Sequence, residues 1–173
     1  MATQRFLSRV GGENKSLKAL VVSAGATDAG KMIATNSAGK LDESLLPPGI
    51  GADVSIVDAS EALGAGDFVN LFAVGGVVKA RLADNASGRP ANGYVTAAVD
   101  ADAQATVYPL DSTNAELTGL TPGAKYWLGT AGGLIETPLD ATDDANVSKI
   151  DQYIGIAKTA TELITTDDSY VVL

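Results

Sequence analysis

Paired glycines between short runs of alternating apolar and polar residues constrain this chain more than any other feature. In the stretch Gly66–Val99, the pair Gly75–Gly76 separates Asp67–Val74 from Val77–Leu82. Glycine adopts the positive φ of a two-residue hairpin turn without strain, and alternation is typical of a half-buried strand. A second pair, Gly132–Gly133, repeats the pattern. We therefore predict a body of short strands joined by glycine hairpins, a scaffold without a catalytic side chain.

Further strand-like segments recur at intervals of roughly 8–12 residues, which is the spacing of a β-sandwich or β-barrel. They are Asp53–Asp58, Gly93–Val99, Ala103–Leu110, Lys125–Gly129, Leu134–Thr137, Ile150–Lys158 and Tyr170–Leu173. Ala160–Ile164 is expected to form a bend, and the apolar last segment to complete a sheet. The predicted fold class is mainly β, with a β-barrel or β-sandwich body and an extended N-terminal arm.

The arm and the body are expected to meet at Pro47–Gly51, because a Pro-Pro pair cannot continue a helix and forces an extended exit. This divides the chain into an arm of residues 1–50 and a body of residues 51–173. Within the arm, residues 1–18 are expected to be extended or irregular, and Ala19–Ser23 to form a short strand. Asn36, Ser37 and Gly39 predict the turn of a short hairpin.

Charge is distributed unevenly between these two parts. Residues 1–50 carry six bases and four acids, whereas the remaining residues carry six bases and 17 acids. The bases nearest the N-terminus are Arg5, Arg9, Lys15 and Lys18, and we predict that they contact an acidic neighbour. The acidic body would repel phosphate, and four bases within eighteen residues are a weak signature of nucleic-acid binding. Nucleic-acid binding is therefore not expected.

The chain contains no cysteine and no histidine. This excludes disulfides, thiolate chemistry, zinc sites of the Cys/His type and a Ser–His–Asp triad. We expect no catalytic residue and no cofactor. No segment approaches the roughly 20 apolar residues of a membrane span. The apolar patch Ala19–Ala24 is shorter than the roughly 7–15 residues of a signal-peptide core, so we expect synthesis in the cytoplasm without secretion.

Three acidic clusters and a few aromatic residues are the remaining candidates for a site. The clusters Asp100/Asp102, Asp140/Asp143/Asp144 and Asp167/Asp168 lack the spacing of a calcium loop and are interpreted as solvated turn residues. Tyr126 and Trp127 point to opposite faces of one predicted strand. One of the two is therefore expected to be exposed or to lie in an interface.

Several segments resemble virion proteins of tailed bacteriophages. GKMIATNSAGKLDESLLPPGIG is similar to the N-terminal segment of many such proteins. DASEALGAGDFVNLF, VVKARLADNASGRPANGYV, GLTPGAKYWLGTAGGLIETP and IGIAKTATELI look like the small β module of phage capsid cement (decoration) proteins, and similar modules occur on tail fibres. These segments fall between about residues 30 and 165.

The resemblance implies a β-barrel or β-sandwich protein, often a homotrimer, on the outer surface of the capsid. Such a protein would bind the major capsid protein at the joints between subunits and stabilise the shell. Two alternatives stay open: a structural adaptor on a tail fibre or baseplate, and a carbohydrate-binding module. Neither a nucleic acid nor a membrane is expected as a partner.

Overall fold

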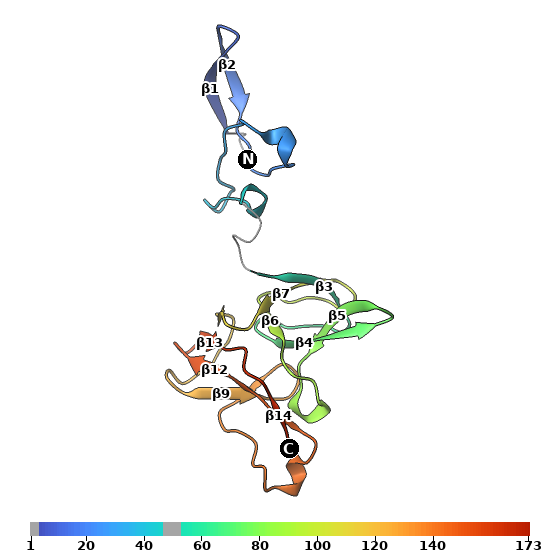
Figure 1. Cartoon of the computed structure of the whole chain (residues 1–173). Helices are drawn as coiled ribbons and strands as arrows, with labels where there is room; N and C mark the ends of the chain where they lie inside the picture. The colour runs from blue at the N-terminus through green and yellow to red at the C-terminus, as the bar shows by residue number, and fades with distance from the viewer. Residues whose placement is uncertain (1–3, 47–52) are drawn as a thin grey trace. The chain divides into compact units, whose positions relative to one another are not determined.

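The computed structural model describes residues 4–46 and 53–173, and it divides into two compact units, Met1–Ala52 and Asp53–Leu173 (Figure 1). We describe each unit by itself. The boundary predicted at Pro47–Gly51 lies outside the described residues. The expected fold class is confirmed, because the body is mainly β and contains a closed barrel.

The first unit begins with an antiparallel hairpin of β1 (Arg5–Val10) and β2 (Glu13–Lys18). Its turn is formed by Gly11 and Gly12, whose φ angles are +63° and +85°. The expectation of an extended or irregular segment over residues 1–18 is therefore wrong for residues 5–18. Two adjacent glycines at positive φ let the chain reverse here as they do in a two-residue hairpin.

The other described residues of the first unit form turns, an isolated bridge and short 3₁₀ helices. Leu20 makes an isolated parallel bridge with Ile33, and this bridge stands where a strand over Ala19–Ser23 was expected. The predicted turn is confirmed, because the Asn36 side chain accepts hydrogen bonds from the backbone N–H groups of Ala38 and Lys40. Two short 3₁₀ helices complete the unit, η1 (Ala26–Asp28) and η2 (Glu43–Leu45).

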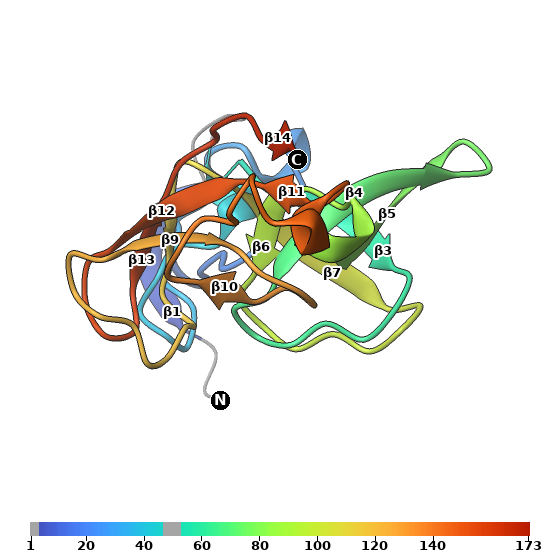
Figure 2. The ribbon, with the colours of Figure 1, turned by 90° about the horizontal axis from the view of Figure 1, so that it is seen from below.

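The body begins with a closed five-stranded barrel in the order β3-β5-β4-β6-β7. The strands are β3 (Ser55–Ala59), β4 (Phe68–Val74), β5 (Val77–Leu82), β6 (Gly93–Val95) and β7 (Gln104–Pro109). The predicted hairpin at Gly75–Gly76 is confirmed, with φ angles of +59° and +81°. Figure 2 shows this β4–β5 hairpin projecting beyond the other barrel strands.

A second sheet of five strands follows, in the order β10-β9-β12-β13-β8. Its strands are β8 (Thr113–Asn114), β9 (Lys125–Leu128), β10 (Leu134–Ile135), β12 (Tyr153–Ala157) and β13 (Leu163–Thr165). The predicted hairpin around Gly132–Gly133 is confirmed by the pairing of β9 with β10. The bend expected at Ala160–Ile164 is shorter, because β13 already begins at Leu163.

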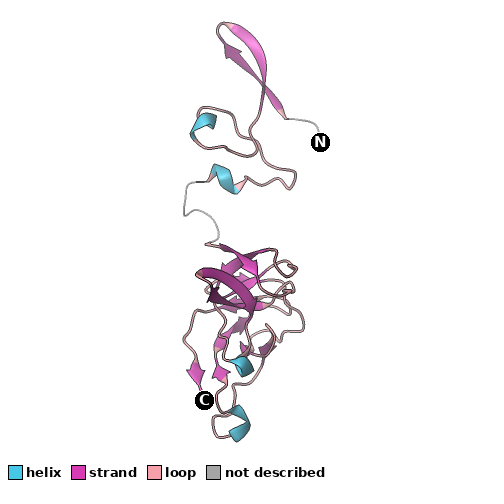
Figure 3. Cartoon of the chain, turned by 90° about the vertical axis from the view of Figure 1, so that its right-hand side faces the viewer, coloured by secondary structure: helices cyan, strands magenta, loops and turns pink. Residues whose placement is uncertain are grey.

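A small two-stranded sheet pairs β11 (Ile150–Asp151) with β14 (Val171–Val172). The apolar C-terminal segment thus joins a sheet, as expected. The single strand predicted over Ile150–Lys158 is divided into β11 and β12 at Gln152. The helical elements described in the body are the 3₁₀ turns η3 (Asn85–Ser87) and η4 (Asp144–Asn146), and strands dominate it in Figure 3.

Two hydrophobic clusters hold the body together. Small aliphatic residues fill the barrel, namely Ala59, Leu63, Val69, Ala80, Val95, Ala105 and Val107. A larger cluster lies between the barrel and the second sheet and adds aromatic rings to aliphatic residues, among them Phe68, Tyr94, Leu128, Ile154 and Leu163. Tyr94 stacks on Tyr108 at 5.7 Å between ring centroids. Sharing this cluster makes the barrel and sheet one packed body.

Candidate functional site

The four N-terminal bases lie on the β1–β2 hairpin but not on one face. Directly paired residues of an antiparallel hairpin share a face, and the pairing joins Arg5 to Lys18, Ser8 to Lys15 and Arg9 to Asn14. Arg5, Arg9 and Lys18 therefore lie together. We call their side of the hairpin the basic face; it consists of Arg5, Leu7, Arg9, Asn14, Ser16 and Lys18.

Every residue of the basic face is exposed. The Arg5 guanidinium donates to the hydroxyl and carbonyl oxygens of Ser16, at 2.9 and 2.8 Å, and this holds its side chain along the strand. None of the three bases forms an ion pair with another residue in the described part of the chain. Their charges are thus available to carboxylates of a partner.

The opposite side of the hairpin, which we call the apolar face, consists of Phe6, Ser8, Val10, Glu13, Lys15 and Leu17. Lys15 lies 3.5 Å from Glu13, so these two charges neutralise each other locally. A groove of about 600 Å³ runs along this face, and Lys18 of the basic face and residues 30–32 complete its lining. Lys15 was predicted as a contact together with the other three bases, but the structure places it apart from them.

The two aromatic interface candidates differ in exposure. Tyr126 is buried, and its hydroxyl accepts the backbone N–H of Thr121 and donates to Glu136, both at 2.9 Å. Tyr126 therefore belongs to the core, and Trp127 is the candidate that the body leaves at its surface. Trp127 is half-buried and meets Tyr153 edge-on, with 5.5 Å between ring centroids. Burial and the nearby Asp168 carboxylate raise the pKa of Tyr153.

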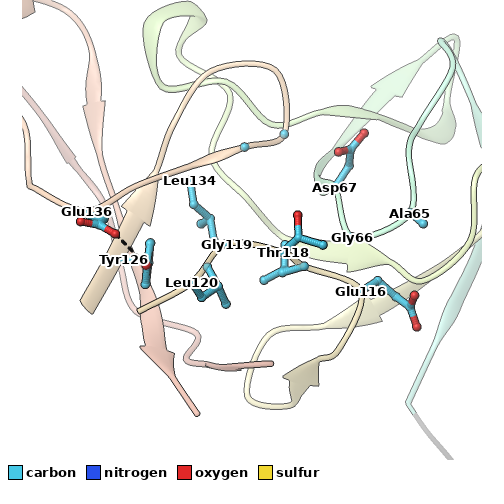
Figure 4. A pocket seen from close by; sticks show the side chains of 13 residues that line it. Ala65, Gly66, Asp67, Glu116, Thr118, Gly119, Leu120, Tyr126, Leu134 and Glu136 are labelled. Carbon is cyan, nitrogen blue, oxygen red and sulfur yellow. Dashed lines mark hydrogen bonds between the residues drawn. The ribbon is translucent and has the colours of Figure 1, made fainter. Parts of the chain in front are cut away.

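A pocket of about 400 Å³ lies between the barrel and the second sheet (Figure 4). Its ionisable residues are acidic, namely Asp67, Glu116 and Glu136, together with Tyr126. Asp67 Oδ2 accepts the Gly64 N–H at 2.6 Å. Burial raises the pKa of the Asp67 carboxyl above its usual value of 3.8, and this hydrogen bond opposes the rise. Its lining includes neither a Lys nor a Ser nucleophile.

The acidic cluster Asp140/Asp143/Asp144 behaves as turn residues. Asp140 accepts the N–H and the hydroxyl of Thr142, which lowers the pKa of its carboxyl. Asp143 caps η4 by accepting the N–H of Ala145. Within residues 4–46 and 53–173, no group of three or more Asp and Glu side chains is arranged to hold a metal ion. The same residues form no helix long and apolar enough to cross a membrane.

The two faces of the hairpin were not foreseen from the sequence. The sequence does contain the pattern of a β-hairpin here, because Gly11–Gly12 is flanked on each side by six residues without Gly or Pro. Only the pairing register, which depends on the two-residue turn, separates Lys15 from the other three bases.

No family model matches the chain, and no curated protein matches it. A solved structure that resembles it is the head fibre gp8.5 N base of bacteriophage phi29. The two chains are 14% identical and superpose with a TM-score of 0.43, over 65% of this chain and 92% of that one. A likeness of this size leaves the function to be argued from the residues themselves.

Proposed function

We propose that the chain is a structural protein of a tailed-phage particle, a capsid cement (decoration) protein that binds and stabilises the shell. The observation that carries the proposal is the basic face, on which three exposed cations form no ion pair with any residue that the structure describes and have no acid among them. The partner is the major capsid protein, and the contact is made on the outer surface of the capsid. The role requires no enzymatic step.

Two further observations support this proposal. Segments over about residues 30–165 resemble phage cement proteins, and the body is a cysteine-free barrel with a second sheet packed on it. A homotrimer suits the role, because weak contacts multiplied by symmetry give high avidity on a repeating surface. The charge difference between the two units fits an arm that binds an acidic neighbour while the acidic body remains soluble.

The proposal is tested by binding the full chain to expanded shells of the phage that encodes it. Replacing Arg5, Arg9 and Lys18 with Ala is expected to lower the apparent affinity about tenfold or more, and added salt is expected to weaken wild-type binding. The control is Lys40→Ala, which removes an exposed base that lies outside the hairpin. Undiminished occupancy by the triple variant would exclude the basic face as the shell contact.

A second candidate function is a carbohydrate-binding adaptor on the tail. The half-buried pair Trp127 and Tyr153 favours it, because aromatic rings at a surface can stack on sugars. A glycan array distinguishes the two functions. Binding that is lost in Trp127→Ala would support the adaptor, and an array without any bound glycan would remove it.

A further inference from the structure

The apolar face of the β1–β2 hairpin has no cover within the described part of its unit. Val10 and Leu17 are 43% and 36% exposed, and Met32 beside them is 54% exposed. Together with Phe6 they border the groove on this face. Among residues 4–42 and 44–46, only Ala19 is buried, at 8% exposure.

An isolated two-stranded hairpin is at best marginally stable in water. Strands of this kind become stable when a third strand or another apolar surface packs on them. Both outer edges of the hairpin are also free, because the described sheet contains only β1 and β2. The hairpin therefore offers an apolar face and two strand edges to an external chain.

We propose that this apolar face is a self-association surface and that its occupant is the same hairpin of a second copy of the chain. The inference names a surface through which copies of the chain associate. It rests on the self-association in the proposed function and does not depend on shell binding.

The charges on the two faces of the hairpin favour a second copy of the chain, rather than another protein, as the partner of the apolar face. On the apolar face Lys15 lies beside Glu13, and Lys31, which lines the groove, pairs with Asp28. Lys18 also lines the groove and is the one lining cation without an ion pair among the described residues, so two copies approach with little net repulsion. The basic face carries three cations and no anion, and two such faces repel each other. An acidic partner would find its counter-charge on the basic face, whereas the apolar face, with a single unpaired lysine in its groove lining, can meet its own copy.

Salt should therefore act oppositely on the two surfaces. The acidic bodies, with an excess of 11 negative charges in residues 51–173, repel one another at low ionic strength. Salt screens that repulsion and leaves apolar contact intact, so self-association should strengthen with salt. Binding through the basic face should weaken under the same conditions.

The first experiment measures the mass of the full chain by sedimentation equilibrium at low and high salt. The double variant Val10→Ser, Leu17→Ser is expected to raise the dissociation constant about tenfold or more. The control is Leu7→Ser, a change of the same kind at a residue that is 79% exposed on the basic face. A monomeric wild-type chain, or equal weakening by the control, overturns the proposal, as does self-association that salt abolishes.

A second measurement does not depend on how well the hairpin tolerates serine. The chain contains no cysteine, so a single introduced thiol is unique. With a short bismaleimide, Val10→Cys is expected to give cross-linked dimers, and Leu7→Cys to give few. Equal cross-linking from both positions contradicts the proposal.

Shell binding separates this inference from the proposed function. If the serine double variant is monomeric and a single copy still binds shells, the self-association surface stands. If the oligomer is intact and shells are not bound, the cement role fails while the inference stands. If the wild-type chain is monomeric and the double variant loses shell binding, the apolar face is a capsid contact and the inference is wrong.

Discussion

Gln152 binds the backbone of Ala91 through both ends of its side-chain amide. Its oxygen accepts the Ala91 N–H at 2.8 Å, and its nitrogen donates to the Ala91 carbonyl oxygen at 3.0 Å. Both residues are 2% exposed. The pair ties the loop before β6 of the barrel to the strand break between β11 and β12, so it fixes how barrel and second sheet join.

Replacing Gln152 with Leu is therefore expected to destabilise the body strongly. The change leaves a buried N–H and a buried carbonyl without partners, at a cost of about 2–5 kcal/mol for the two groups. Chemical denaturation measures the loss of unfolding free energy. Gln104→Leu, on an exposed position of β7, is the matched control and should change stability little. Similar losses of unfolding free energy for both variants would contradict the stabilising role assigned to the hydrogen bonds between Gln152 and Ala91.

Local signals explain which elements could be predicted from the sequence. The β4–β5 hairpin follows from Gly75–Gly76 and from alternation on either side, both of which act between neighbours in the chain. The parallel pairing of β3 with β5, which brings Asp58 beside Lys79, could not be predicted. The β3–β5 pairing joins segments that are distant in the sequence and closes the barrel. It depends on tertiary packing, which no local sequence pattern encodes.

The split of one predicted strand at Gln152 has the same kind of cause. Apolar and polar residues alternate along 150–158 as they would in one strand. The side-chain amide of Gln152, however, is hydrogen-bonded to the backbone of Ala91, 61 residues away in the sequence. The candidate site shows a similar limit. Its basic residues were visible in the sequence, whereas their division between two faces depends on the register of β1 with β2.

Gly155 permits the close approach of β12 and β13. A Cβ at this position would collide with the carbonyl oxygen of Ile164 and lie 2.9 Å from its carbonyl carbon. We expect Gly155→Ala to cost about 2–4 kcal/mol, because neighbouring backbone must shift. Thermal melting with circular dichroism detects the loss. In the control Gly133→Ala the added Cβ meets only the Thr130 carbonyl oxygen, at 3.3 Å, and a smaller effect is expected.

Asp67 should make the body less stable as the pH rises. Burial raises the pKa of its carboxyl in the folded state above 3.8, so folding favours the protonated form. The stabilisation is complete below pH 3.8 and is lost as the pH rises through the folded-state value. Asp67→Asn does not titrate and can still accept the Gly64 N–H. Its melting temperature is expected to exceed that of the wild type at neutral pH, and the difference to vanish in acid.

Asp140 provides a control of opposite sign for this pH dependence. Hydrogen bonds from Thr142 lower the pKa of its carboxyl below 3.8, so its contribution is present at neutral pH and is lost as the pH falls. Asp140→Asn should melt below the wild type at neutral pH and converge with it in acid. If the two variants shift in the same direction across the pH range, the assigned causes are wrong.

Tyr126 should contribute to stability through its hydroxyl rather than through an interface. The hydroxyl accepts the Thr121 N–H and donates to Glu136, and the ring is 4% exposed. Tyr126→Phe keeps the ring and removes both bonds, at an expected cost of about 1–3 kcal/mol. Tyr170→Phe, at a residue 47% exposed, is the control and should be nearly neutral. Sedimentation of Tyr126→Phe should give the same mass as the wild type, because a buried tyrosine takes no part in binding another copy. A change in mass without loss of stability would instead place Tyr126 in an interface.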